Sequence, residues 1–516
     1  MRTHLVLLSL LLFGMAPACA PSPTPGPAPA PAVVDAAALS EVAERRILSE
    51  TIRDHLDYLA SDEMRGRDTP SPELEDAADY LVARFQELGV EPAGEEGGFI
   101  QRWPFEVLSL NRAESRALME VDGDRREWRY AEEYFAIPSL PGQVEGVPVY
   151  APDPATAAQG LPAEVAGAPL VVGLPEGLGP DFGLAIQAGM QAGAAGVVLL
   201  MDEETDASAT FQLAAALEGG IAGEMPFPII GLRHDVGQEL LTSAGLEAGP
   251  GEVRVMENLV VSFQSTFEPE VHEVPNVVGM VRGSDPELAD EYIVLTAHFD
   301  HVGVGPSDER GDSIYSGADD NASGTAALLE VAGAMASLPE APARSVLFLA
   351  VSGEEKGLLG SAWFAQNPTI PAEGMVAALN MDMVSRNAPD TVHAIGEEYS
   401  TIGRLAHEVA RDHPELGLVV APDPEPEEQA FLRSDHFSFV EQGIPALMLT
   451  TWLHDDYHLP SDTPDRADED KAARIARLAF LMAHRMADTP DPPTWTAEGE
   501  ALLEQLAGQG PPPGQP

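Results

Sequence analysis

Apolar residues in the first part of the chain recur at helical spacing. Two such sets lie between residues 33 and 88: Ile47, Ile52, Leu56 and Leu59, and then Ala77, Leu81, Phe85 and Leu88. This spacing is typical of amphipathic helices. Gly89 is expected to end the second helical region, and the segment from Met64 to Pro70 is expected to be a loop because glycine and proline interrupt it.

The pattern changes between about Glu114 and Phe263. Short β-branched runs are separated there by loops rich in Gly, Pro and Ala, and no His, Cys or carboxylate cluster stands out. We therefore expect a separate, smaller β-rich domain without catalysis of its own. Its Ala/Gly-rich stretch from Ala185 to Leu200, followed by Pro226 to Ile230, resembles the protease-associated domain that is inserted in many exopeptidases.

After Asn276, apolar runs of strand length alternate with segments of helix length. This alternation predicts an α/β fold with a doubly wound, mostly parallel sheet. The expected organisation is a signal peptide (1–18), a Pro/Ala-rich linker (19–35), the N-terminal part of the α/β domain (36–113), the inserted domain (114–263), the rest of the α/β domain (264–488) and a loose Pro/Gly-rich tail around one short amphipathic stretch (489–516).

Several strand-like runs of the last domain end on side chains that bind metals. Tyr292–Ala297 precedes His298, Val346–Val351 precedes Glu354 and Glu355, Met375–Met381 precedes Asp382, and Ile444–Thr450 leads to His458. Ligand sites of open α/β sheets form at the carboxyl ends of strands, so these side chains are expected to converge if the strands are neighbours.

Asp320 adds a further carboxylate, in the polar loop Gly317–Gly324 that opens an Ala/Leu-rich helix from Thr325. Taken singly, each of these residues is more ordinary as a turn, a helix cap or a core residue. Together, two histidines and three carboxylates suit a pair of zinc ions, with one carboxylate bridging and open positions for water and substrate.

The ordered set resembles the co-catalytic zinc aminopeptidase family, which includes bacterial leucine aminopeptidases and, more distantly, glutamate carboxypeptidases. The resemblance covers about Pro275–Thr463 and, more weakly, Leu48–Pro92. It implies a zinc exopeptidase fold and two Zn²⁺ ions held by His298, Asp320, Glu355, Asp382 and His458, with Asp320 as the bridge. It further implies that Glu354 is the general base, that Asp300 orients His298, and that Tyr457 donates a hydrogen bond to the tetrahedral intermediate.

Other polar residues nearby match no ligand position of that family. His301 and Asp319 are expected in a second layer around the site or in its wall. Ser434–Asp435–His436 is contiguous, whereas a hydrolytic triad is assembled from separate segments, so a loop lining the site is expected. The segment from Glu427 to Phe439 is expected to build part of the specificity pocket, with Phe431, Phe437 and Phe439 either lining it or lying in the core.

The resemblance implies an aminopeptidase that removes N-terminal residues from peptides. Three alternatives stay open: a one-zinc glutaminyl cyclase, a carboxypeptidase, and a metal-free binding protein. The carboxypeptidase relatives carry a long helical domain after the final histidine, and only a short segment follows His458 here. Binding proteins of this fold have substituted ligands, whereas this chain keeps the full set.

Composition changes this picture in two ways. The formal net charge is −56, with 84 acidic against 28 basic residues, which excludes nucleic acid as a partner and leaves a peptide as the expected one. The basic start, the apolar stretch Leu5–Met15 and the small residues Ala16–Ala18 predict an export signal.

Cys19 follows this signal and is the only cysteine, which resembles a bacterial lipoprotein cleavage site. We expect a cell-envelope lipoprotein, periplasmic or on the cell surface, or a secreted protein, with membrane contact only through a lipid anchor at Cys19. One cysteine excludes internal disulfides and cysteine-based zinc sites. The sequence does not indicate an oligomeric state.

Overall fold

The computed structural model describes residues 36–509, apart from 138, 140–141, 175–180, 202–226 and 247–250. The predicted signal peptide, the linker and Cys19 therefore lie outside the described residues, as does the end of the predicted tail. Within the described part, no helix is both long and apolar enough to cross a membrane.

The N-terminal helices follow the predicted spacing: α1 (Ala36–Arg46), α2 (Ser49–Leu59) and α3 (Pro72–Leu88). Helix α3 begins where the Ser71 hydroxyl accepts a hydrogen bond from the Leu74 N–H at 3.0 Å, with a proline in the first turn. It ends at Gly89, whose φ of +77° is the left-handed conformation that glycine adopts readily. The predicted helices and the predicted helix stop are confirmed.

A mixed nine-stranded sheet forms the centre of the α/β part, in the order β1-β13-β15-β14-β16-β19-β17-β18, with β2 pairing β13. Its strands are β1 (Glu91–Pro92), β2 (Ile100–Leu110), β13 (Phe267–Val281), β14 (Tyr292–His298), β15 (Ser345–Val351), β16 (Met375–Met381), β17 (Thr391–Ile395), β18 (Val419–Ala421) and β19 (Ala446–Thr450). The central strands β15, β14, β16 and β19 are mutually parallel. Antiparallel pairs occur toward the edges of the sheet, where β13 pairs β15 and β17 pairs β19.

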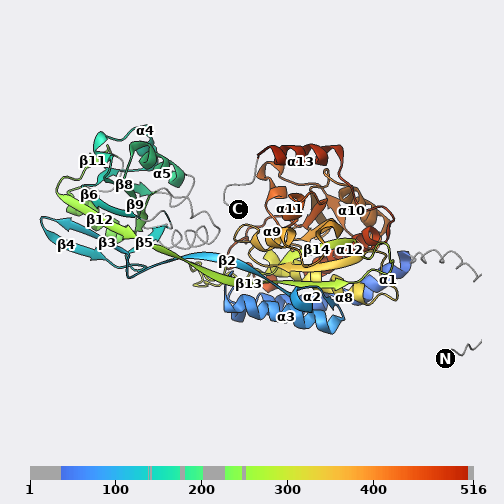
Figure 1. Ribbon diagram of the computed structural model, residues 1–516. Coiled ribbons are helices and arrows are strands. Elements are labelled where there is room, and N and C mark those ends of the chain that lie inside the picture. Colours follow the sequence, from blue (N-terminus) through green and yellow to red (C-terminus); the bar gives the residue numbers. More distant parts are fainter. Residues whose placement is uncertain are drawn as a thin grey trace, which may run out of the picture.

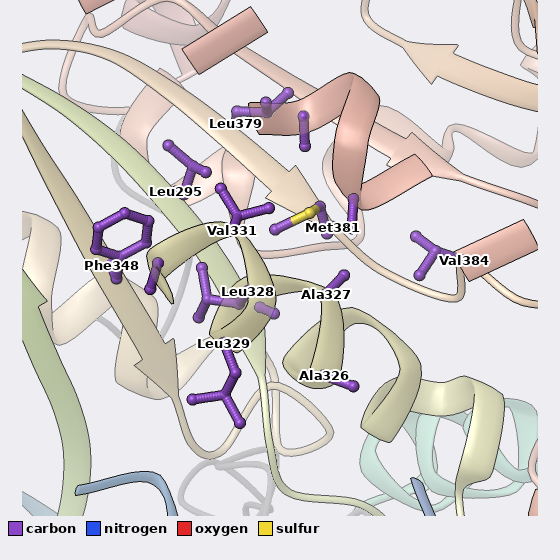
Figure 2. Close-up of a cluster of buried hydrophobic side chains, with 14 of the residues drawn as sticks. Leu295, Ala326, Ala327, Leu328, Leu329, Val331, Phe348, Leu379, Met381 and Val384 are labelled. Atoms are coloured by element: carbon purple, nitrogen blue, oxygen red, sulfur yellow. The ribbon is translucent and has the colours of Figure 1, made fainter. Parts of the chain in front are cut away.

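Both faces of the central strands are buried, and alternate residues belong to the two hydrophobic cores on either side of the sheet. In β14, Ile293 and Leu295 belong to one hydrophobic cluster, whereas Val294 belongs to the other. The first cluster includes residues of α8 (Gly324–Ala336), α10 (Thr401–Asp412) and α12 (Glu469–Asp488), and the second includes residues of α9 (Leu359–Gln366) and α11 (His436–Val440). Figure 2 shows side chains of α8 packed beside Leu295, Phe348 and Leu379 of three central strands. The doubly wound α/β fold is confirmed.

The segment between β2 and β13 folds on two sheets of its own (Figure 1). The four-stranded antiparallel sheet contains β3 (Arg116–Val121), β4 (Asp124–Trp128), β6 (Gly142–Gly146) and β12 (Leu259–Ser265). The six-stranded sheet contains β5 (Tyr134–Ile137), β7 (Val149–Ala151), β8 (Pro169–Leu174), β9 (Gly196–Met201), β10 (Ile229–Leu232) and β11 (Arg254–Val255). Helices α4 (Pro154–Gln159), α5 (Asp181–Ala192) and α7 (His234–Ser243) accompany them. Its identity as a protease-associated domain stays a prediction.

A long antiparallel ribbon joins this part to the α/β part. Strands β2 and β13 pair continuously from Leu110 with Phe267 to Ile100 with Val277. Figure 1 shows this ribbon running between the two bodies. The chain thus leaves the central sheet along one strand and returns along the neighbouring strand.

The prediction of a loose C-terminal tail is wrong for residues up to 509. Helix α13 (Ala497–Gln509) forms there, and Leu502, Leu503 and Leu506 pack against the core on the α9–α11 face. Trp495 fastens the approach to the helix by donating its indole N–H to the Gly443 carbonyl at 2.9 Å. The amphipathic stretch was recognised in the sequence, but the apolar surface that receives it arises from distant segments.

Candidate metal centre

The central parallel strands deliver the predicted side chains to one edge of the sheet. His298 is the last residue of β14, Asp382 directly follows β16, and Glu354 and Glu355 follow β15 closely. Strand β19 precedes the loop that carries His458. Because β15, β14, β16 and β19 are parallel neighbours, their carboxyl ends meet at the same edge of the sheet. The predicted convergence of the side chains depended on this adjacency.

Asp320 reaches this edge from an irregular turn, Ala318–Ser323, directly before α8, in which Asp320 and Asn321 have non-helical backbone angles. The buried Asp462 carboxylate accepts hydrogen bonds from the main-chain N–H groups of Asp319, at 3.0 Å, and Asp320, at 3.1 Å. The Asn321 side chain donates to the Met381 carbonyl at 3.0 Å and accepts from the Met383 N–H at 3.1 Å. The turn is therefore held from both sides, against the His458 loop and against the end of β16.

The side chains form two donor groups that share Asp320. The first contains His298, Asp320 and Asp382, and the second contains Asp320, Glu355, His458 and His301. His298 Nε2 lies 3.3 Å from Asp320 Oδ1 and 3.4 Å from Asp382 Oδ1. His458 Nε2 lies 3.1 Å from both Asp320 Oδ2 and Glu355 Oε2. The structure thus brings together all five residues that the sequence proposed as ligands.

This geometry fits zinc. Ligand atoms bound at about 2.0–2.1 Å in a tetrahedron are about 3.3 Å apart, close to the separations within each group. Among the described residues, the buried Nε2 atoms of His298 and His458 and Oδ1 of Asp382 have no hydrogen-bond partner, although each lies within 3.4 Å of another atom of its own donor group. Unpaired buried polar atoms are costly, and one cation in each group would satisfy them.

His301 lies closer to the centre than the sequence indicated. We expected His301 in a second layer around the site or in its wall, because it matches no ligand position of the family that the sequence resembles. Its Nδ1 is 2.7 Å from Glu355 Oε1 and 3.7 Å from Asp320 Oδ2, and the side chain is fully buried. His301 therefore either orients Glu355 or offers a further donor to the second group. The sequence shows a histidine at position 301, but it does not show in which direction the side chain points.

Asp300 contacts His298 differently from the expectation. The hydrogen-bond partner of His298 Nδ1 is the Asp300 main-chain carbonyl, at 3.2 Å, whereas Oδ1 of the Asp300 carboxylate lies 3.7 Å away. That carboxylate instead accepts hydrogen bonds from the Glu354 N–H at 3.3 Å and from the Thr69 hydroxyl at 3.1 Å. Asp300 thus orients His298 mainly through its backbone and ties the loop of Glu354 through its side chain.

The two adjacent glutamates have opposite electrostatic surroundings. Burial raises the pKa of Glu354 well above its usual value, and the neighbouring Glu355 and Asp382 carboxylates add to the effect although His298 opposes it. Burial also acts to raise the pKa of Glu355, but His458 and His301 outweigh it and lower that pKa to about 2. Glu354 is thereby suited to exchange a proton, whereas Glu355 is suited to remain an anion.

His298 shows the same competition from the imidazole side. Burial alone would lower its pKa, but the charges of Glu354 and Asp382 raise it well above the usual value. The carboxylate charges that raise this pKa would also favour a metal cation bound at the centre.

Of the three residues Ser434–Asp435–His436, Ser434 lines the pocket, and the three do not form a catalytic triad. The Ser434 hydroxyl donates to Asp382 Oδ2 at 2.6 Å and accepts from the Asn380 side chain at 2.7 Å, so it holds Asp382 in place. His436 is fully buried, with its ring against Phe431. The Asp319 carboxylate has a structural role, because its Oδ1 accepts hydrogen bonds from the N–H and the hydroxyl of Ser385.

A pocket opens directly beside the donor groups. Its lining includes the carboxylates of Asp320, Glu354 and Asp382 and the charged pair Glu428 and Arg433. The other lining residues form an apolar wall with a few hydroxyl groups: Met383, Ala430, Ser434, Met448, Thr450, Trp452, Leu453 and Tyr457. The segment from Glu427 to Phe439 contributes to this lining. Its phenylalanines do not, because Phe431 and Phe439 are buried in the core and Phe437 packs against it.

Tyr457 lies at the metal centre, and its expected role as a hydrogen-bond donor stays a prediction. It lines the pocket together with Glu354, and its ring stacks on His458 at a centroid distance of 3.9 Å. Burial raises its pKa above the usual value, with the carboxylates Asp320 and Glu355 adding to the effect. The phenol therefore keeps its proton and remains a hydrogen-bond donor.

Comparisons with known proteins agree with this geometry. A probable zinc metalloprotease of Leptosphaeria maculans is 32% identical over 178 residues, which is 31% of this chain and 39% of that protein. A glutamate carboxypeptidase 2 homolog of Caenorhabditis briggsae is 34% identical over 171 residues, which is 32% of this chain and 20% of that protein. The chain thus matches less than two fifths of the length of these relatives.

Among solved structures, the aminopeptidase from Aneurinibacillus sp. strain AM-1 has a similar fold. It superposes with a TM-score of 0.53 at 19% sequence identity, covering 88% of this chain and 97% of that one. Residues 276–483 match the sequence model of Peptidase family M28, and this range includes every donor of the two groups. The resemblance indicated by the motifs is thereby confirmed, and this segment matches peptidase family M28.

Proposed function

We propose that the chain is a zinc-dependent aminopeptidase that hydrolyses the first peptide bond of peptides with a free amino terminus. The observation that carries this proposal is the pair of donor groups joined at Asp320, with the buried carboxyl of Glu354 in the same pocket. Two ions bound there would activate a shared water near neutral pH and polarise the scissile carbonyl. The ligands proposed are His298, Asp320 and Asp382 for one ion, and Asp320, Glu355 and His458 for the other.

Glu354 is the proposed general base. Its Oε2 lies 4.0 Å from His298 Nε2, so the carboxyl stands at the edge of the first donor group without belonging to it. It accepts the proton of the attacking water as the new C–O bond forms. It then returns that proton to the amine nitrogen as the C–N bond breaks. Tyr457 donates its O–H toward the developing negative charge on the carbonyl oxygen.

The charge of the pocket favours an amino terminus over a carboxylate. Asp320, Glu354, Asp382 and Glu428 all line it, and among the described lining residues Arg433 is the one cation. Arg433 lies 3.7 Å from Glu428, so its charge is already partly balanced. A substrate ammonium group would gain from these surroundings, and the apolar wall would receive the first side chain.

A carboxypeptidase is the second candidate, favoured by the presence of Arg433 in the pocket and by the similarity to a glutamate carboxypeptidase 2 homolog. In that case the guanidinium would bind the substrate carboxylate, and Arg433→Gln would abolish turnover. An aminopeptidase would lose little activity with the same variant, because its substrate presents an amine at the centre. Glutaminyl cyclase activity would be recognised by conversion of an N-terminal glutamine without peptide cleavage.

The proposal is tested with one tetrapeptide in three forms: free, N-acetylated and C-terminally amidated. The purified protein is expected to contain about two zinc ions per chain, to cleave the free and amidated forms, and to spare the acetylated form. Cleavage of the acetylated form with sparing of the amidated form would instead identify a carboxypeptidase. Protein that binds no zinc and cleaves none of the three would contradict both candidates.

A further inference from the structure

We propose that the loop Met64–Pro70 is a positioning element of the metal centre, which acts through Arg67 and Thr69. This inference rests on the proposed function, because it concerns the geometry of the proposed ligands. The loop precedes the family match at residues 276–483 by a long stretch of chain and supplies no donor to either group. The sequence indicated only that it is a loop.

Arg67 joins the two segments that carry ligands of the first group. Its guanidinium is fully buried and donates to the carbonyls of Phe299 at 2.8 Å, Ser316 at 2.8 Å and Gly317 at 3.1 Å, and also to that of Leu59. Phe299 directly follows His298, and Ser316 and Gly317 lead into the turn of Asp320. One rigid, planar side chain thus sets the distance between the backbones that present these two donors.

The backbone of the loop is fastened to the same segment. The His301 N–H donates to the Arg67 carbonyl at 3.3 Å, and the Gly303 N–H donates to the Gly66 carbonyl at 3.2 Å. Gly66 has φ +73°, and a Cβ there would lie 2.5 Å from the carbonyl oxygens of both Gly303 and Tyr315. Only glycine permits this approach, so the loop and the segment after β14 form one packed unit.

Thr69 connects the ligand side of the centre with the base side. Its hydroxyl donates to Asp300 Oδ2 at 3.1 Å and accepts from the Gly353 N–H at 3.2 Å. Gly353 directly precedes Glu354, whose own N–H donates to the other oxygen of Asp300 at 3.3 Å. The Thr69 hydroxyl therefore closes a ring of hydrogen bonds that fixes Glu354 relative to His298.

These contacts favour a positioning role over simple packing. The side-chain hydrogen bonds of Thr69 all end on Asp300 or beside Glu354, and three of the four carbonyls bound by Arg67 belong to the segments of His298 and Asp320. Burial lowers the pKa of Arg67 to about 10, opposed by the charges of Asp300 and Asp320, so the guanidinium stays charged at neutral pH. Partners one layer outside the metal ligands commonly govern affinity and activity in this way.

The sharpest test removes only the Thr69 hydroxyl. Thr69→Val keeps the shape of the side chain, Thr69→Ser keeps the hydroxyl, and Thr401→Val is the matched control. The Thr401 hydroxyl also accepts from a main-chain amide, the Thr494 N–H at 3.0 Å, but at the start of α10. For each protein the zinc affinity of the metal-free form is measured by chelator competition, the visible absorption spectrum with Co²⁺ alone is recorded, and kcat and KM are determined.

For Thr69→Val we expect zinc affinity or kcat to fall by about 10- to 100-fold, an altered Co²⁺ spectrum, and little change in KM. Thr69→Ser should restore all of these, and Thr401→Val should match the wild type. Thr69→Ala, which fits any space that threonine leaves, provides the same test should the valine variant fold poorly. Arg67→Lys, which keeps the charge but not the planar fork, is expected to change the spectrum in the same direction.

The inference is overturned if folded Thr69→Val and Thr69→Ala keep wild-type zinc affinity, Co²⁺ spectrum and kcat, even when their melting temperatures fall. That outcome would leave the loop a purely structural role. Failure of the proposed function looks different, because the wild type itself would then bind no zinc or would cleave the N-acetylated peptide.

Discussion

Glu354 and Glu355 are adjacent and chemically identical, yet their surroundings assign them different roles. Glu355 Oε2 lies 3.1 Å from His458 Nε2 within a donor group, whereas Glu354 belongs to neither group and has a pKa raised by burial. Glu354→Gln keeps the size of the side chain and removes the basic oxygen. We expect both zinc ions to remain while kcat falls by about 10²- to 10⁴-fold.

Glu355→Gln removes a charged ligand and leaves the base in place. Zinc content should fall toward one ion per chain, and excess zinc should restore part of the activity. Elemental analysis beside steady-state rates, with and without added zinc, distinguishes the two variants. The roles would be reversed if Glu354→Gln lost zinc while Glu355→Gln kept both ions and stayed inactive.

The buried ring of His436 makes the stability of the fold depend on pH. Burial lowers its pKa from 6.5 to about 3, so the folded protein keeps it neutral where the unfolded chain takes up a proton. The unfolded state therefore binds more protons below about pH 6.5, and stability falls as the pH falls through this range. Above pH 6.5 the ring has no such effect.

The measurement is urea unfolding of metal-free protein at several pH values. Between pH 6 and pH 5, the free energy of unfolding of the wild type should fall by about 1.2 kcal/mol more than that of His436→Gln, since a single proton is involved and the unfolded ring is already partly protonated at pH 6. Other groups titrate alike in both proteins and cancel in this comparison. Parallel pH curves for the two proteins would show that His436 is protonated in the folded state.

At the scale of elements, the start of helix α8 is packed against the end of β16 without space for a side chain. A Cβ at Gly324 would lie 2.2 Å from the Met381 carbonyl oxygen and 2.3 Å from Asn321 Oδ1. These atoms belong to the neighbours of Asp382 and Asp320, so Gly324→Ala must displace both ligands. We expect a loss of about 1–3 kcal/mol of unfolding free energy and weaker zinc binding.

Gly333 provides the matched control within the same helix. Its added Cβ would lie 2.7 Å from Leu88 Cδ2, the end of a flexible side chain that can move. Alanine also gains about 1 kcal/mol of helix propensity over glycine, which offsets the adjustment. Gly333→Ala should therefore keep zinc affinity and stability near those of the wild type, and equal damage by both variants would contradict the assignment.

At the scale of the whole molecule, the α/β part and the inserted part have separate cores joined by the ribbon of β2 and β13. Ser109 pairs with Glu268 in this ribbon, and the buried clusters on either side draw on different segments. Replacing residues 110–267 with an Asn-Gly turn would close the ribbon as a two-residue hairpin. The shortened protein is expected to fold, to bind zinc as the full chain does, and to cleave small aminoacyl substrates.

Circular dichroism, zinc analysis and turnover of an aminoacyl anilide measure this outcome. Full-length protein and a variant that keeps the insert but carries Glu354→Gln serve as the positive and negative controls. Loss of zinc binding in a folded, shortened protein would show that the insert contributes to the centre.

Local sequence patterns were enough to predict the elements and to name the candidate donors of the centre. The spacing of Ile52, Leu56 and Leu59 predicted a helix, because burial on one face repeats apolar residues at the helical period. The apolar run before His298 predicted a strand, because burial on both faces makes every residue apolar. The donors could be named because metal-binding side chains follow strand ends in a recognisable order. These signals lie within a few residues of one another and need no knowledge of distant contacts.

How distant segments meet could not be predicted from such patterns and is known from the fold alone. The order β15-β14-β16-β19, the direction of His301, the burial of Phe431 and the docking of α13 all depend on packing between parts far apart in the chain. No local pattern predicts the positioning role of Arg67 and Thr69, since the carbonyls beside His298 and Asp320 and the Asp300 carboxylate lie more than 200 residues away in sequence. Periodicity reports which face of an element is buried, whereas the identity of its partner follows from the packing of the whole chain.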